Sequence, residues 1–298
     1  LGYEPSIVAR ARSNREMDSV VVFAANPSAF STSETNHGVE AAARKRRFLL
    51  NIVSLDESDM DSVKARVRMG LSIRPAGVIV YEYDRAGIAA LEYIPKDMPM
   101  VVVGGSFGDG EYQVINAERD GGRWMTMHLL DLGHRTVFHV GRPEGPTDNT
   151  RTNGWRDALK ERGVTAPDPI IVPDDDLEES VKAGRTLGRR GDVTAIFAGN
   201  DETAIAVIRG LREVGRRVPA DVSVVGFDDR NFGAMWNPAL TSYTQNFLDM
   251  GERSFRMLFE QIQAKRAGDD APPSQVEVVQ GKPCLRASER AYGDGEIA

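Results

Sequence analysis

Cysteine and long apolar stretches are scarce in this sequence. Cys284 is the single cysteine among 298 residues, so no internal disulfide is possible and a reducing compartment is expected. No run reaches the roughly 18 apolar residues that a membrane-spanning helix needs. The first residues also lack an apolar stretch followed by a small-residue cleavage site, which argues against export of the chain as written. We therefore expect a cytoplasmic protein without a membrane segment.

Motifs for nucleotides, zinc and nucleophilic catalysis are missing or incomplete. The patterns GxxxxGK[ST], GxGxxG after a strand, and HExxH do not occur. Residues 104–108, GGSFG, fit the GxSxG nucleophile elbow, but such a hydrolase needs an acid and then a histidine farther along the chain. The four histidines are His37, His128, His134 and His139. All four lie at or before residue 139, too early in the chain to follow the acid of such a hydrolase. They also form no metal-binding pair on one helical turn, so we expect no enzyme, metal or cofactor.

Neither sign of charge dominates the chain. The 37 Lys and Arg residues face 44 Asp and Glu residues, and the net charge of -7 provides no general attraction to nucleic acid or membrane. The hydrophobic content of 41% and charged content of 27% are typical of a soluble globular protein, and the length suits two domains. Because the chain begins at Leu1 instead of methionine, we expect a fragment whose missing part holds some of the function.

One complete β-α-β unit spans residues 192–229. Its apolar runs at 194–198 and 222–225 predict buried parallel strands, and apolar residues at helical spacing from 202 to 214 predict the helix between them. Polar residues follow each strand, namely Asn200, Asp201 and Asp228. Ligands of open parallel sheets bind outside the carboxyl ends of the strands. The sequence therefore predicts a binding site at this edge.

The same alternation of strands and helices occurs twice, over about residues 20–117 and 135–229. Strands are predicted at 20–24, 48–53, 77–80, 100–103, 114–116, 137–140 and 170–172, with two late strands at 276–279 and 283–287. Helices are predicted at 38–46, 61–69, 86–93, 120–132, 151–162, 178–189 and 248–267, and a polar loop at 26–36. The predicted fold class is α/β, with two tandem doubly wound parallel sheets. The late helix and strands predict that the chain crosses back between the halves and forms a hinged cleft.

Arg151 opens a predicted helix after a polar loop. A lone arginine there is usually a solvated charge, yet its rigid five-donor fork could hold vicinal hydroxyls or a carboxylate. Asp228 accepts hydrogen bonds and Asn200 both donates and accepts, so the three together suit a polyhydroxyl ligand. The aromatic residues Phe23, Phe30, Trp155, Phe227 and Trp236 are core residues by default, and one or two are candidates for an apolar platform under a sugar ring.

Residues 1–15 form a basic arm, in which Arg10, Arg12 and Arg15 outweigh Glu4. Composition alone favours a solvated linker over a nucleic-acid-binding arm.

Several long motifs follow one another along the chain. They are LGYEPSIVAR, HLLDLGHRTVFHVG, RTNGWRDAL, AIFAGNDETAIAVIRGLREVGRRVPADVSVVGFDD and NPALTSYTQNFLDMG. In these motifs the chain resembles the lac repressor family of bacterial transcriptional regulators over nearly its whole length. The resemblance implies a helix-turn-helix head, here absent, a hinge helix, and a periplasmic-binding-protein-like core of type I with two subdomains and three crossovers. It also implies a homodimer that senses a small molecule and binds operator DNA.

The resemblance assigns roles to individual residues. Arg151, Asn200 and Asp228 match the family's effector contacts, Gln245 matches a residue at the crossover near the ligand, and Asp120 matches a cleft-edge aspartate. The variable loop after the first strand, with Ser28 and Phe30, helps to select the ligand. The residues of the DNA-binding hinge are Ser6, Ala9, Arg10 and Arg12. Two positions depart from the family: Arg12 replaces the usual leucine wedge, and no tryptophan stands in DDDLEESVKA before Gly184.

The resemblance also implies domain limits. We expect the end of the head and the hinge at 1–17, an N-terminal subdomain at 18–132 plus 246–272, a C-terminal subdomain at 133–245 plus 273–292, and a tail at 293–298. The leading hypothesis is a ligand-responsive repressor whose effector is a sugar. The alternative from the transport class is an extracytoplasmic sugar-binding protein, which would need an export signal upstream. A sugar-modifying enzyme is disfavoured, because no set of acid, base and nucleophile is evident.

Overall fold

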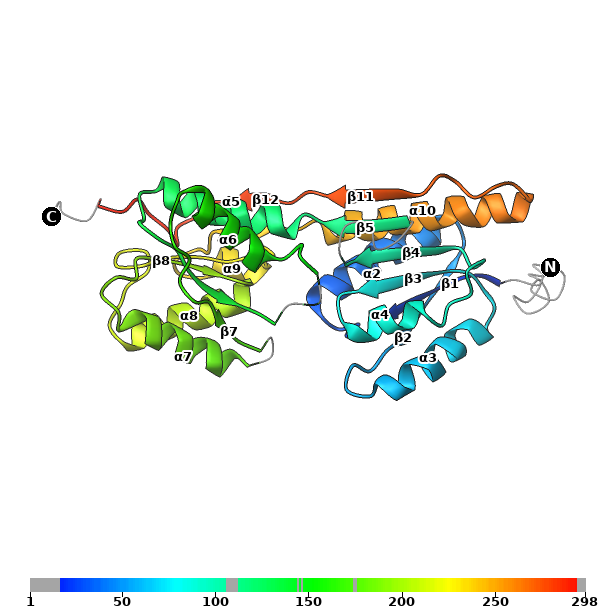
Figure 1. The fold of residues 1–298 in the computed structure, drawn as a ribbon, viewed down its shortest axis with the longest axis horizontal. Coiled ribbons are helices and arrows are strands. Elements are labelled where there is room, and N and C mark those ends of the chain that lie inside the picture. Colours follow the sequence, from blue (N-terminus) through cyan, green and yellow to red (C-terminus); the bar gives the residue numbers. More distant parts are fainter. Residues whose placement is uncertain (1–16, 106–111, 144, 146, 174–175, 294–298) are drawn as a thin grey trace, which may run out of the picture. The chain divides into compact units, whose positions relative to one another are not determined.

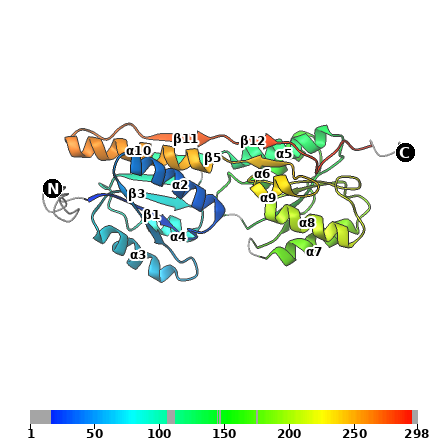
Figure 2. The same cartoon turned by 180° about the vertical axis from the view of Figure 1, so that it is seen from behind.

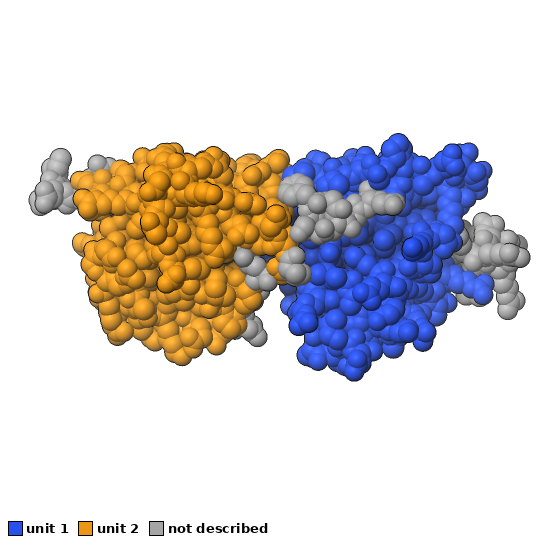
Figure 3. Space-filling model, viewed as in Figure 1, with its two compact units in different colours: residues 1–116, 246–279 blue, residues 117–245, 280–298 orange. Residues whose placement is uncertain are grey.

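The structure is a computed structural model that describes residues 17–105, 112–143, 145, 147–173 and 176–293. The expected hinge residues Ser6, Ala9, Arg10 and Arg12 lie outside these ranges. The chain divides into two compact units (Figure 3). Unit 1 comprises Leu1–Asn116 and Asn246–Val279, and unit 2 comprises Ala117–Gln245 and Gln280–Ala298. The chain therefore passes between the units three times, as expected.

Unit 1 contains a six-stranded sheet in the order β11-β5-β4-β3-β1-β2. Its strands are β1 (Met17–Ala24), β2 (Leu49–Ser54), β3 (Pro75–Glu82), β4 (Met100–Gly104), β5 (Tyr112–Asn116) and β11 (Gln275–Val279). All neighbouring strands pair in parallel. Every residue of β3 is buried, as expected for a parallel strand that helices cover on both faces.

Helices cover both faces of this sheet (Figures 1 and 2). They are α2 (Phe30–Lys45), α3 (Met60–Ser72), α4 (Arg85–Leu91) and α10 (Phe247–Ala267). Alternate residues of β1 point into two cores: Val20 and Val22 pack with residues of α2 and α10, whereas Val21 and Phe23 pack with residues of α3 and α4. The strand period of two thus divides one valine-rich run between the two layers.

The polar loop expected at 26–36 is wrong from Phe30 onward, because α2 begins there. Tertiary contacts stabilise the polar first half of this helix. The Phe30 ring packs edge-on against Phe247, with centroids 5.8 Å apart. The buried Asn36 accepts a 2.8 Å hydrogen bond from the Tyr81 hydroxyl. Local composition favoured a loop, and these long-range partners outweigh it.

Unit 2 contains a four-stranded parallel sheet in the order β7-β6-β8-β9. Its strands are β6 (Phe138–Gly141), β7 (Ile170–Ile171), β8 (Ala195–Ala198) and β9 (Ser223–Val225). The helices are α5 (Glu118–Asp131), α6 (Arg151–Glu161), α7 (Leu177–Gly188) and α8 (Asp201–Glu213). Ile196 and Ala198 pack against α7 and α8, and Ala195 and Phe197 pack against α5 and α6. The expected α/β class with two parallel sheets is confirmed.

The expected domain limits at 132 and 272 move to 116 and 279. Helix α5 belongs to unit 2 because it packs closely on α6, where a Cβ at Gly154 would lie 2.0 Å from the Arg119 carbonyl oxygen. Strand β11 belongs to unit 1 because it pairs with β5 at the edge of that sheet. Both contacts join segments that are distant in sequence, and local patterns do not reveal them.

Three short elements complete unit 2. Helix α9 (Asn231–Met235) and strand β10 (Ser242–Thr244) are absent from the expectations, and β12 (Lys282–Cys284) is shorter than the expected strand at 283–287. Strands β10 and β12 pair antiparallel. None of the helices in the described ranges combines the length and apolarity needed to cross a bilayer.

Candidate functional site

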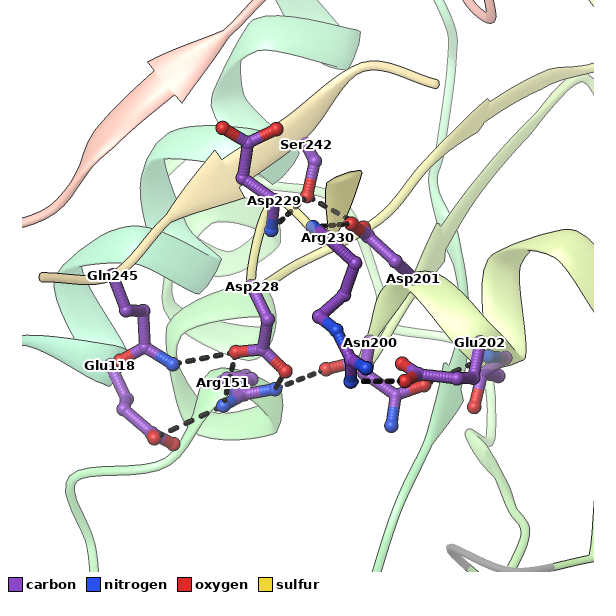
Figure 4. A network of polar contacts seen from close by, with 12 residues as sticks. Glu118, Arg151, Asn200, Asp201, Glu202, Asp228, Asp229, Arg230, Ser242 and Gln245 are labelled. Carbon is purple, nitrogen blue, oxygen red and sulfur yellow. Dashed lines mark hydrogen bonds and ion pairs between the residues drawn. The ribbon is translucent and has the colours of Figure 1, made fainter. Parts of the chain in front are cut away.

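Arg151 lies at the centre of a polar cluster beyond the carboxyl ends of β8 and β9 (Figure 4). It is the first residue of α6, whose start is capped by the Thr150 hydroxyl, 3.1 Å from the Asn153 backbone nitrogen. Only 7% of Arg151 is exposed. Its guanidinium lies over the Phe227 ring, 4.2 Å from the centroid, and donates to the Gly199 carbonyl oxygen. The helix start and this ring thus fix the direction of the side chain.

Two carboxylates form ion pairs with the Arg151 guanidinium. Its Nη2 lies 3.0 Å from Asp228 Oδ1 and 3.1 Å from Glu118 Oε1, and its Nη1 lies 3.4 Å from Asp228 Oδ2. Burial acts to lower the pKa of Arg151, but the charges of Asp228 and Glu118 outweigh it and raise the pKa above its ordinary value. Arg151 is therefore a permanent cation.

Asp228 is held from three sides. Besides its ion pair with Arg151, its Oδ1 accepts a 2.7 Å hydrogen bond from the Gln245 amide. Its backbone nitrogen donates to the Tyr243 carbonyl oxygen at 2.9 Å. Asp228 and Asp229 both have left-handed backbones, with φ values of 88° and 49°. Two consecutive residues of this kind without glycine store strain, which often marks a functional turn.

A buried carboxyl group supports this turn through hydrogen bonds (Figure 4). Asp201 is 0% exposed. Its Oδ1 accepts from the Ser242 hydroxyl and its Oδ2 accepts from the Arg230 backbone N–H, both at 2.6 Å. Ser242 Oγ in turn accepts the Asp229 N–H at 3.0 Å. Burial, with the charges of Asp228 and Asp229, raises the pKa of Asp201 to about 7, against its hydrogen bonds.

Asn200 has a structural role that spacing alone did not reveal. Its side-chain oxygen caps α8 by accepting the Thr203 N–H at 2.8 Å. It follows Gly199, whose carbonyl oxygen Arg151 contacts. Asn200 therefore lies at the strand end that Arg151 contacts, and its side-chain oxygen already accepts one hydrogen bond.

The structure brings Arg151 and Gln245 each into direct contact with Asp228 and does not do so for the other expected residues. Asp120 lies in the first turn of α5 with an exposed side chain. Ser28 and Phe30 belong to unit 1, where the Ser28 hydroxyl donates to Asn26 at 2.9 Å. Their participation in binding stays a prediction.

Sequence reasoning missed Glu118 and Ser242. Glu118 opens α5 directly after β5, only two residues before Asp120, and an acidic residue at a helix start is a usable but weak signal. Ser242 carried no signal, because its role depends on a fold that brings β10 beside α8. Among the aromatic candidates, Phe227 lies under Arg151, Trp155 is fully buried, and Trp236 is 39% exposed.

The chemistry of the cluster is that of a polar binding site. It contains carboxylate and carbonyl oxygens and an amide, and the fully buried Phe227 ring lies beneath the guanidinium. Within the described ranges, no three His, Cys, Asp or Glu side chains are placed to hold a metal ion. The GGSFG segment extends into residues that the structure does not describe.

Comparison with known proteins identifies the class of this fold and then the family. Residues 126–288 match the family model of the periplasmic binding protein-like domain. The HTH-type transcriptional repressor PurR of Yersinia enterocolitica is 30% identical over 285 residues, which cover 93% of this chain and 82% of that protein. These matches show a periplasmic-binding-protein-like effector-binding core. The chain belongs to the lac repressor family of transcriptional regulators, as the sequence motifs predicted.

Two solved structures share the fold. The transcriptional regulator CelR in complex with cellobiose has a TM-score of 0.77 and 26% identity, covering 92% of this chain and 85% of that chain. The lac repressor dimer bound to operator and an anti-inducer has a TM-score of 0.81 at 22% identity, covering 97% and 100%. At that identity, the second likeness speaks for the fold alone.

Proposed function

We propose that this chain is the effector-binding core of a ligand-responsive transcriptional repressor, and that its effector is a sugar. The cluster of Arg151, Asp228 and Gln245 at the carboxyl ends of the unit 2 strands carries the proposal. Hydroxyl groups of a sugar donate to the exposed edges of carboxylates and accept from amides. The CelR structure, which contains cellobiose, supports a sugar as the ligand class.

The proposed mechanism is a shift between two arrangements of the protein. An effector that binds one arrangement more tightly increases the population of that arrangement. The ratio of its affinities for the two arrangements sets the upper limit of the shift. Operator binding is assigned to a DNA-binding segment of the full protein, in keeping with the PurR relative. The hydrogen bond between Asp228 and Gln245 joins the strained turn after β9 to the last residue of this part of unit 2. The chain continues from Gln245 into unit 1. A ligand contact there would bias the backbone at a point where the chain changes units.

We also propose a homodimer, with a second copy covering a groove on unit 2. The groove between α7, α8 and Trp236 has a volume of about 490 Å³. Leu177 and Trp236 are 47% and 39% exposed at its edge. Glu202, Arg209 and Glu213 give the groove both signs of charge, which suits a self-complementary two-fold contact. The lac repressor, a member of the same family, forms a dimer, which supports a second copy as the occupant.

A thermal-shift screen against neutral mono- and disaccharides tests the effector proposal. A ligand at tenfold above its Kd stabilises the folded protein by about 1.4 kcal/mol, so a binding sugar raises the Tm. Asp228→Asn and Gln245→Ala should each weaken that response by about tenfold in Kd, because each removes a partner of the central contact. Asp131→Asn, an exposed change on α5, serves as the matched control. Equal responses from all four proteins would place the sugar elsewhere and reject this site.

A further inference from the structure

The Arg151 guanidinium has no terminal N–H left for a ligand. Its Nη1 donates to the Gly199 carbonyl oxygen and faces Asp228 Oδ2, and its Nη2 faces Asp228 Oδ1 and Glu118 Oε1. These four contacts account for the four terminal hydrogens. The remaining donor, Nε, is buried and has no hydrogen-bond partner in the described part of the chain. An incoming carboxylate or phosphate would have to displace a carboxylate that is already in place.

The cluster is also anionic. One guanidinium faces two carboxylates, so these three side chains carry a net charge of -1. The side chains of Arg151 and Asp228 are 9% and 11% exposed, whereas that of Glu118 is 28% exposed. Glu118 is therefore the charge of this group that a ligand in solvent meets first. A second negative charge brought into a partly desolvated anionic site weakens binding. A neutral hydrogen-bond donor that contacts the carboxylates strengthens it.

We infer that Glu118 is a specificity-determining residue, which makes the Arg151 site select neutral or cationic hydrogen-bond donors and reject carboxylates and phosphates. This inference rests on the proposed function, because it concerns the same site. Its position is stable: Glu118 is the first residue of α5, where the backbone amides attract an acidic side chain. Without the charge of Glu118, Arg151 would face one carboxylate and these three side chains would have no net charge, and without the whole side chain an Nη2 donor would also be available.

Two variants separate the charge of Glu118 from its hydrogen bond. Glu118→Gln keeps the size of the side chain and an oxygen that can accept from Arg151 Nη2, but removes the charge. Glu118→Ala removes both. If Glu118 only holds Arg151 in place, Glu118→Gln should behave as the wild type. If it selects by charge, both variants should accept anions.

Inorganic phosphate is the probe, because it needs no knowledge of the effector. The Tm is measured from 0 to about 50 mM phosphate at constant ionic strength, which keeps general screening unchanged. Glu161→Gln is the charge-matched control: it makes the same change beside Arg123, where both partners of the ion pair are 45% exposed. We expect phosphate to raise the Tm of Glu118→Gln and Glu118→Ala, with about tenfold tighter binding than to the wild type or Glu161→Gln.

Equal phosphate responses in the wild type and both Glu118 variants would overturn the inference. So would a response of Glu161→Gln as large as that of Glu118→Gln, because net charge alone would then explain the effect. A second arm compares neutral monosaccharides with their 6-phosphates. Preference of the wild type for a phosphorylated member would also overturn it. If no sugar binds any protein but phosphate distinguishes the variants, the charge selection stands and the sugar proposal fails.

Discussion

The two units share one architecture but bury different kinds of polar side chain. In the described part of unit 1, the buried polar side chains are mainly amides and hydroxyls, such as Asn36, Gln113 and Thr35, together with the carboxyl group of Glu82. In unit 2, the strand ends bury Arg151 and Asp201, and Asp228 lies beside them. Amides can be satisfied by one or two neutral hydrogen bonds, whereas buried ions need charged partners. The comparison shows that the same β-α-β winding buries mostly uncharged polar side chains in one unit and a cluster of ion pairs in the other.

The largest expected effect on stability compares a buried ion pair in unit 2 with a buried amide in unit 1. Arg151→Met should destabilise the protein by about 3–5 kcal/mol, because it leaves Asp228 and Glu118 without their counter-ion. Asn36→Ala in unit 1, which removes the partner of the Tyr81 hydroxyl, should cost only about 1–3 kcal/mol. Urea denaturation of both variants provides the measurement. An Arg151→Met variant as stable as Asn36→Ala would show that the charges of unit 2 are solvated in practice.

A smaller effect depends on pH and on Asp201. Its pKa is about 7 in the folded protein against an ordinary value of 3.8, so the folded state binds the proton more tightly than the unfolded state. The group therefore costs no stability below pH 4, and its cost grows as the pH rises to 7 and is complete above that. The upper limit is about 4 kcal/mol. Between pH 4 and 7, titration of Asp201 lowers the free energy of unfolding of the wild type as the pH rises. The Asp201→Asn variant should lack this contribution.

Ser242→Ala is the companion variant for this test. It removes one hydrogen bond to the Asp201 carboxylate, so it should raise the pKa of Asp201 further and extend the loss of stability to higher pH. Identical profiles for the wild type and Asp201→Asn would mean that Asp201 is not the titrating group.

The smallest effect on the stability of the single chain is expected at the unit 2 groove. Leu177→Glu and Trp236→Glu change half-exposed side chains and should alter the free energy of unfolding of the monomer by about 0.5 kcal/mol or less. They should nevertheless weaken the proposed dimer by at least tenfold in Kd, since each places a charge in an apolar contact. Sedimentation velocity over a range of concentrations measures this. Tyr93→Glu, a comparably exposed change in unit 1, is the control, and equal association of all variants would exclude the groove as the interface.

Sequence and structure agree where a local residue pattern and the tertiary fold favour the same element. The valine-rich runs of β1 and β3 and the apolar run of β8 predicted buried parallel strands, because a strand covered on both faces must be apolar throughout. The rule that ligands bind at the carboxyl ends of parallel strands then predicts, from the sequence alone, that Asp228 and Asn200 lie at one edge. The polar loop before Arg151 and the family motif that contains it both indicate Arg151 as a site residue. Its contact with Asp228 is consistent with a site at the carboxyl ends of the strands.

Other features were decided only by contacts between segments distant in sequence. Residues 30–36 look like a loop but form the start of α2, because Phe247 and Tyr81 provide partners for that turn. Glu118 looks like an ordinary acidic residue at a helix start until the fold brings it 3.1 Å from Arg151.

The amino-acid sequence by itself determined the α/β class, the repeated sheet and the residue types at the strand ends, since these depend on periodicity and on neighbours in the chain. Only the tertiary structure decided which ions share a site, how many carboxylates face one guanidinium, and which carboxyl group is buried enough to hold its proton near neutral pH. Those properties depend on distance and solvent exposure, which a linear sequence does not specify.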